Sequence, residues 1–214
     1  YHGQAQLAAG ILPSTSWAYQ ANATGYPYDP QRAKELLKQA GFPNGFTMSI
    51  WAPAIQRVYN PNALRMAELM QADLAQVGIE AQIISYEWNT FRQRMARGEH
   101  DTALIGWVAD NADPDNFLRP LLSCEAVRSG ANRTNWCDPD FDQQLLAAIQ
   151  LTDKEQRQQL YQRIETHVMH QVPLLPIASS LRFEAHRQNI TGVELPPYGG
   201  IRFGNARRLT HVPL

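Results

Sequence analysis

A chain of 214 residues, 44% of them hydrophobic, is long enough to bury the core of one large domain. Its 19 basic and 20 acidic side chains nearly cancel, and no Lys/Arg cluster alternates with aromatic residues, which argues against nucleic acid or an anionic membrane surface as partner. No apolar run approaches the roughly 18 residues of a membrane-spanning helix. Because the chain opens on Tyr1 and not on Met, we expect it to be processed or part of a longer chain.

The first half of the chain alternates helical and strand patterns, with Pro near predicted helix starts and Gly after predicted helix ends. In chain order the sequence predicts a helix from Pro30 to Gly41, a strand over 46–52, a helix from Pro61 to Gly78, a strand over 79–86, a helix over 89–97 and a strand over 101–107. Strands joined by helices need crossover connections, and the run 101–107 is apolar almost throughout. The fold class is therefore predicted to be α/β, with a largely parallel sheet covered by helices.

The second half is predicted to be mainly helical before it becomes irregular. Asp138 and Pro139 start one helix, and Asp153 starts a longer amphipathic one that runs to about Gln171. Two strand-like runs follow, over 174–180 and 181–187. The tail 191–214 is rich in Gly and Pro and has no helical period, so it is expected to leave the domain.

The acidic stretch GWVADNADPDNF, residues 106–117, holds three carboxylates after an apolar strand. Asp113 precedes Pro114 and is expected to cap a helix, with Asp115 in its first turn. No helix begins at Asp110, which follows the strand at the sheet edge where such folds bind ligands. Its carboxylate is expected either to accept hydrogen bonds from nearby loop amides or to meet a cation.

Arg57 lies in the loop after the strand 46–52, where its planar guanidinium can hold a carboxylate; the alternative is a solvated surface arginine. The sequence has no GxSxG, phosphate-binding glycine loop or HExxH motif, so we predict no catalytic residue. His167 and His170 share one side of a helix but lack an evident acidic partner. We accordingly predict neither a metal site nor a cofactor.

Cys124 and Cys137 flank what is expected to be a polar loop, EAVRSGANRTNW. A structural zinc site would need two more Cys or His ligands nearby, and none is present, so a disulfide is the favoured interpretation. A disulfide would indicate an oxidising compartment. Two buried free thiols in a cytosolic protein remain the alternative.

From ISYEWNTFRQRMARGEHDTALIGWVADNADPDNFLRPLLSC on through ANRTNWCDPDFDQQL, the chain resembles the periplasmic dipeptide-binding proteins of bacterial ABC importers, in the peptide and nickel solute-binding family 5. The resemblance extends from ILPSTSWAY to FGN, and ASSLRFEA and LPPYGG are similar to its antimicrobial-peptide-resistance members. It implies a two-lobed periplasmic binding protein of class II, cluster C type. Residues 1–190 would form the C-terminal ligand-binding lobe, and residues 191–214 would return toward a missing N-terminal lobe.

The resemblance also implies ligand-binding residues. In a Gly-Trp-x-x-Asp pattern, Asp110 corresponds to the aspartate that binds the α-ammonium group of the ligand, and Trp107 lines the pocket. In an Arg-x-Tyr-x-Pro pattern, Arg57 corresponds to the arginine that binds the ligand carboxylate, with Tyr59 beside it. The cysteine pair of the family matches Cys124 and Cys137, which supports the disulfide.

The function that the resemblance implies is capture of short peptides, dipeptides above all, and their delivery to an ABC permease in the inner membrane. Such a protein is periplasmic, is a monomer when full length, and performs no catalysis. Relatives on the same scaffold bind antimicrobial peptides, haem or glutathione, and these ligands remain alternatives. The rival of another class is an α/β hydrolase or peptidase.

Overall fold

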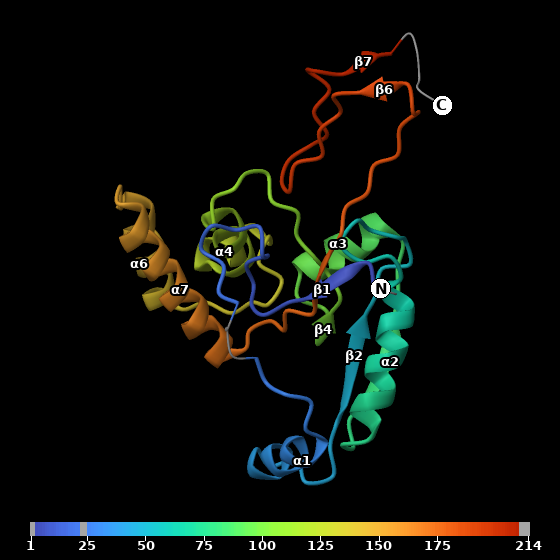
Figure 1. Ribbon diagram of the computed structural model, residues 1–214. Coiled ribbons are helices and arrows are strands. Elements are labelled where there is room, and N and C mark those ends of the chain that lie inside the picture. The colour runs from blue at the N-terminus through green and yellow to red at the C-terminus, as the bar shows by residue number, and fades with distance from the viewer. Residues whose placement is uncertain (1–2, 22–24, 210–214) are drawn as a thin grey trace.

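The computed structural model describes residues 3–21 and 25–209, and Figure 1 shows how its helices and strands are arranged. The elements in chain order are β1 (Ala5–Leu7), α1 (Pro30–Gln39), β2 (Thr47–Trp51), α2 (Ala63–Ala75), β3 (Glu80–Ile84), α3 (Trp88–Ala96), β4 (Thr102–Ala103), α4 (Asp115–Leu122), α5 (Cys124–Ser129), α6 (Pro139–Gln150), α7 (Lys154–Gln171), β5 (Ala178–Ser180), β6 (Ile190–Thr191) and β7 (Arg207–Arg208). The helices and strands predicted in the first half are present. Their caps follow the expected chemistry, as when Asp29 accepts the N–H of Arg32 at the start of α1.

The central sheet has the strand order β3-β2-β4, and both pairs are parallel. Alternate residues of β2 point to opposite faces, so its two sides pack against different helices. Ile50 packs in one cluster with Ala67 of α2, whereas Trp51 packs in another with Phe91 of α3. The predicted α/β fold, with a parallel sheet covered on both faces, is therefore confirmed.

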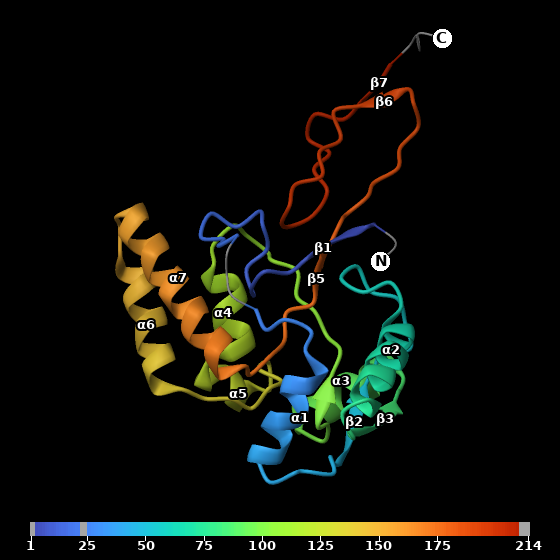
Figure 2. The same ribbon diagram turned by 60° about the horizontal axis from the view of Figure 1, so that its bottom comes forward.

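A second core lies among α4, α6 and α7, which Figure 2 shows side by side. Phe141 and Leu145 of α6 and Tyr161 of α7 are fully buried there. Leu12, from the segment before α1, is buried in the same cluster. The helical block thus packs on the early part of the chain as well as on itself.

Three segments differ from the sequence predictions. The strand expected over 101–107 is reduced to β4, because Ala103 pairs with Trp51, the last residue of β2. The run 181–187 forms no strand, because the pairing of β5 with β1 ends near Leu181, whose N–H reaches Gln4. The stretch between the cysteines begins as the helix α5 and is not a loop throughout, because Ser123 caps it by accepting the N–H of Ala126.

The tail forms an antiparallel hairpin that projects from the rest of the molecule in Figures 1 and 2. Its strands β6 and β7 are joined by a long turn, which Glu194 and Arg202 bridge through backbone hydrogen bonds. The predicted boundary between the lobe and a returning segment near residue 190 stays a prediction, and residues 210–214 lie outside the described part of the chain. Within the described ranges no helix combines the length and apolar character needed to cross a membrane.

Glu165 on α7 is a buried carboxylate in the helical core. Its Oε1 accepts the N–H of Leu12 at 2.9 Å, while Oε2 has no hydrogen-bond partner among the described residues. Gly10 passes so close that a Cβ there would lie 2.4 Å from Oε1. Burial raises the pKa of Glu165, although the N–H groups of Ile11 and Leu12 oppose the shift.

We expect Glu165→Gln to change how stability depends on pH. A pKa raised in the folded state means that the stability contribution of Glu165 is fully present below its unfolded pKa and is lost as the pH rises through its folded pKa. Glutamine does not titrate but buries an unpaired amide, at a cost of about 1 to 3 kcal/mol. The variant should be less stable than wild type at acidic pH, and the gap should narrow as the pH rises. Urea unfolding across that range measures it; a constant gap would contradict the expectation.

Candidate ligand-binding site

The loops that carry the predicted ligand-binding residues meet at one edge of the parallel sheet. β2 and β4 are neighbours and run in the same direction, so the loops after them lie at the same edge. The two loops are in contact at Gly106 and Tyr59. A Cβ atom on Gly106 would lie only 2.4 Å from Cγ of the Tyr59 ring. Only glycine at position 106 allows this close approach.

In the acidic loop, side-chain oxygens hold backbone N–H groups in succession. The N–H of Asp110 donates to Oδ1 of Asn116 at 2.9 Å. The N–H of Asp113 donates to Oδ1 of Asn111, and the N–H of Asp115 donates to Oδ1 of Asp113. Asp113 therefore accepts an N–H at the start of α4, as a cap would, but the helix begins at Asp115 with Pro114 in the N-cap position, one residue later than predicted.

Arginines neutralise two of the three carboxylates in this loop. Arg119 forms a bidentate pair with Asp115, with both N···O distances 2.8 Å. Arg157 of α7 lies 2.8 Å from Oδ2 of Asp113, and the hydroxyl of Tyr161 donates to Oδ1 of Asp113 at 3.3 Å. Burial and the charge of Asp113 raise the pKa of Tyr161, which keeps the hydroxyl protonated.

Asp110 is the remaining carboxylate of the loop, and it is exposed. Within residues 3–21 and 25–209 its side chain accepts no hydrogen bond and forms no ion pair. The loop N–H groups donate instead to the side chains of Asn111, Asp113 and Asn116. Of the two expectations for Asp110, the structure does not support the one in which it satisfies nearby amides.

Arg57 is half-buried against aromatic rings and is not a solvated surface side chain. Its guanidinium carbon lies 4.2 Å from the ring centroid of Trp88 and 5.9 Å from that of Tyr59. Its Nε is buried without a hydrogen-bond partner in the described part of the chain. The two rings lie against the guanidinium, and none of its N–H donors is used in a hydrogen bond within the described residues, so they are available to a planar acceptor such as a carboxylate.

Trp107 is 37% exposed and lines an open pocket of about 440 Å³ next to α4 and α5. Asp115, Asn116 and Arg119 line the same pocket. Of the four residues predicted to bind ligand, Trp107 is the one on its wall. The pocket therefore adjoins the acidic loop, whereas Arg57 and Tyr59 belong to the neighbouring loop.

The structure brings Arg57 together with Tyr59, and Tyr59 against the start of the acidic loop. No hydrogen bond or ion pair links Arg57 directly to Asp110 among the described residues. Two contributors were not predicted, Trp88 under Arg57 and Asn116 beside Asp110. Trp88 begins the helix after the next strand of the same sheet, and this position at the carboxyl edge is the signal that could have identified it.

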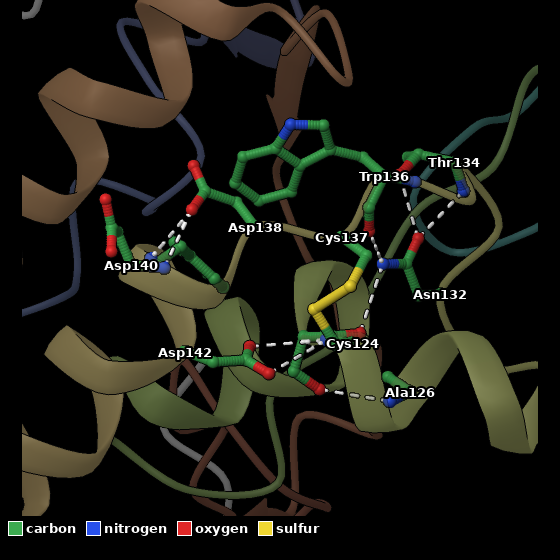
Figure 3. The surroundings of a disulfide bond; sticks show 11 residues. Cys124, Ala126, Asn132, Thr134, Trp136, Cys137, Asp138, Asp140 and Asp142 are labelled. Atoms are coloured by element: carbon green, nitrogen blue, oxygen red, sulfur yellow. Dashed lines mark hydrogen bonds between the residues drawn. A yellow bond between two sulfur atoms is a disulfide. The ribbon is translucent and has the colours of Figure 1, made fainter.

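Cys124 and Cys137 form the predicted disulfide (Figure 3). The N–H of Cys124 donates to the carboxylate of Asp142, and the side chain of Asn132 donates to the carbonyl of Trp136. The disulfide thus ties α5 to the segment that leads into α6. The alternative of two free thiols is ruled out for this structure.

His167, one of the two histidines considered for a metal, is engaged elsewhere. Its Nε2 lies 2.7 Å from Oδ2 of Asp138, and this hydrogen bond lowers the pKa of Asp138. The same carboxylate caps α6 through the N–H groups of Asp140 and Phe141. Within the ranges that the structure covers, no group of three His, Cys, Asp or Glu side chains is arranged to hold a metal ion.

A parallel α/β unit with charged side chains at its carboxyl edge is the arrangement of a ligand-binding module. Residues 1–129 match the family model of bacterial extracellular solute-binding proteins, family 5 Middle, and the chain belongs to this family. It is 42% identical over 205 residues to the dipeptide-binding protein of Escherichia coli, covering 96% of this chain and 38% of that protein.

The similarity extends to other peptide-binding proteins and to solved structures. The chain is 41% identical to the peptide transport periplasmic protein SapA of Salmonella typhimurium, covering 99% of this chain and 38% of that protein. The crystal structure of the dipeptide-binding protein from Pseudoalteromonas sp. SM9913, in complex with Met-Leu, superposes with a TM-score of 0.90 at 48% identity, covering 97% of this chain and 41% of that one. The chain therefore spans less than half the length of these relatives.

Proposed function

We propose that this chain is the C-terminal lobe, with its returning segment, of a periplasmic binding protein that captures short peptides for an ABC permease in the inner membrane. The observation that carries the proposal is the charge arrangement at the sheet edge. Arginines hold Asp113 and Asp115, whereas the Asp110 carboxylate accepts no bond from the described residues. The neighbouring loop presents Arg57, held by Trp88.

In this proposal Asp110 binds the α-ammonium group and Arg57 the α-carboxylate of a dipeptide, with Tyr59 and Trp107 beside them. Each charge-assisted hydrogen bond contributes about 1.5 to 3 kcal/mol when shielded from water. Selection by the two termini makes affinity nearly independent of the side chains. The family is one of solute-binding proteins. In this proposal the full-length protein is a periplasmic monomer that binds its ligand without changing it chemically.

We expect that blocking either end of a dipeptide weakens binding far more than exchanging a side chain, because each block leaves a protein charge unpaired. Calorimetry on the full-length protein with Met-Leu, its N-acetyl derivative and its C-amide is the measurement. A dipeptide with different side chains and free ends is the control. Equal affinity for blocked and free peptides would rule out recognition of the termini.

The structure of the periplasmic binding protein DppA from Helicobacter pylori in complex with the peptide STSA, 34% identical to this chain, supports a second candidate, a longer peptide ligand. Titration with free-ended peptides of increasing length separates the two. Affinity that falls steeply beyond the dipeptide supports the first proposal, whereas affinity that rises with length supports the second.

A further inference from the structure

The peptide unit that joins Ala109 to Asp110 is held on both sides. Its carbonyl, on Ala109, accepts a hydrogen bond from the N–H of Gly199 at 3.0 Å. Its N–H, on Asp110, donates to Oδ1 of Asn116 at 2.9 Å. A trans peptide unit is planar and its two polar groups point in opposite directions, so these bonds fix its orientation. The direction in which the Asp110 side chain leaves the backbone is then set from both sides.

The hydrogen bond to Ala109 comes from a segment far away in the sequence. Gly199 belongs to the 196–200 turn, which lies between β6 and β7. Figures 1 and 2 both show the turn of this hairpin pointing back toward the loop before α4. The φ angle of Gly199 is +69°, in the left-handed region that favours glycine. This backbone conformation accompanies the hydrogen bond from its N–H to Ala109.

Arg182 holds the 196–200 turn in place. Its Nη1 donates to the carbonyl of Pro196 at 3.2 Å and to the carbonyl of Gly199 at 3.0 Å. Arg182 is half-buried and has no carboxylate partner within the described ranges. Because the planar guanidinium bonds two carbonyls of the same turn, it restricts the turn more than a single hydrogen bond would.

We propose that Arg182 is a positioning residue for ligand recognition, because it orients the Asp110 carboxylate through the 196–200 turn. The inference rests on the proposed function, in which Asp110 binds the ammonium group of a peptide. Without Arg182, the turn loses two hydrogen bonds and the Ala109–Asp110 peptide unit loses its fixed donor. The carboxylate then samples other directions, and recognition of the free amino end weakens more than the rest of binding.

The test compares Met-Leu with N-acetyl-Met-Leu in the full-length protein and in Arg182→Met, which keeps the aliphatic bulk of the side chain. We expect Arg182→Met to bind Met-Leu about tenfold more weakly while N-acetyl-Met-Leu changes little, so that the preference for the free amino end shrinks. Hydrogen exchange of the Gly199 amide should be faster in the variant without ligand. Arg182→Lys, whose ammonium can still donate to carbonyls, should recover part of the preference.

Arg187→Met is the matched control, because Arg187 lies in the same segment and is exposed. It should bind both peptides as wild type does. If Arg182→Met keeps the wild-type preference for Met-Leu over N-acetyl-Met-Leu, this inference is wrong, but the proposed function stands. A wild type that does not distinguish the two peptides overturns the proposed function, and this inference with it. If Arg182→Met does not fold, Arg182→Gln replaces it, since it also removes the guanidinium that bonds the 196–200 turn, and the same two outcomes decide.

Discussion

Asp110→Asn is expected to weaken the binding of a free dipeptide by about 2 to 5 kcal/mol, the usual penalty for removing one member of a charge pair that the complex shields from water. Thermal stability should change by less than about 0.5 kcal/mol, because Asp110 is exposed and its carboxylate holds no partner among the described residues. If Asp110 instead satisfied loop amides, the substitution would lower stability by about 1 kcal/mol and affinity only indirectly. A pair of melts and a pair of titrations on the full-length protein separate the two cases.

Asp113→Asn is the control in the same loop, with the opposite pattern expected. Its carboxylate contacts Arg157 and Tyr161, with the side chains of Asp113 and Arg157 34% and 21% exposed. Loss of this charge-assisted bond should cost about 1 kcal/mol of stability, while the affinity of the folded protein falls less than tenfold. Wild-type affinity in Asp110→Asn, or loss of binding in Asp113→Asn alone, would show that the ligand role belongs to another carboxylate.

Removal of the disulfide is expected to cost about 3 kcal/mol of stability. Cys124 and Cys137 are 13 residues apart. On the chain-entropy model, opening a loop of this length raises the entropy of the unfolded chain and lowers the free energy of unfolding by about 3 kcal/mol. Replacing both cysteines by serine avoids leaving a single reactive thiol. Denaturant unfolding of the wild type and the double variant measures the difference.

Reductant supplies the control for the disulfide. It should lower the stability of the wild type to that of the Cys124→Ser/Cys137→Ser variant and leave the variant unchanged. Asn132 and Ser123 keep their hydrogen bonds in both, so packing near the bridge should not add a large separate loss. If the oxidised wild type and the double variant unfold at the same denaturant concentration, the bridge contributes nothing to stability.

Local signals explain why most of the fold could be predicted. The start of α1 depends on Asp29 and Pro30, and the start of α6 on Asp138 and Pro139, so neighbours in the sequence decide where these helices begin. The lengths of β4 and β5 depend instead on where a partner strand ends, which is not encoded locally. For the same reason the apolar run 101–107 was predicted as a longer strand than the structure contains.

The candidate site could be predicted only in part. The pattern of residues identified Asp110 as the carboxylate without a helix to cap, but its role toward a ligand came from the family resemblance. The contact of Trp88 with Arg57 joins segments 31 positions apart, from 57 to 88, and Gly199 reaches Ala109 across an even longer separation. Such contacts depend on the packing of the whole chain. The position of Trp88 after the neighbouring strand could have indicated the first contact, whereas nothing in the sequence indicates the second.

The close contact of Tyr59 with Gly106 has an evolutionary consequence. Any side chain at position 106 would overlap the Tyr59 ring, and moving the ring would displace the neighbouring Arg57. A substitution at position 106 is therefore expected to affect ligand binding by moving Tyr59 and Arg57 in the neighbouring loop, even though it alters no charged group. We therefore expect a side chain at position 106 to be tolerated only where position 59 carries a residue smaller than tyrosine.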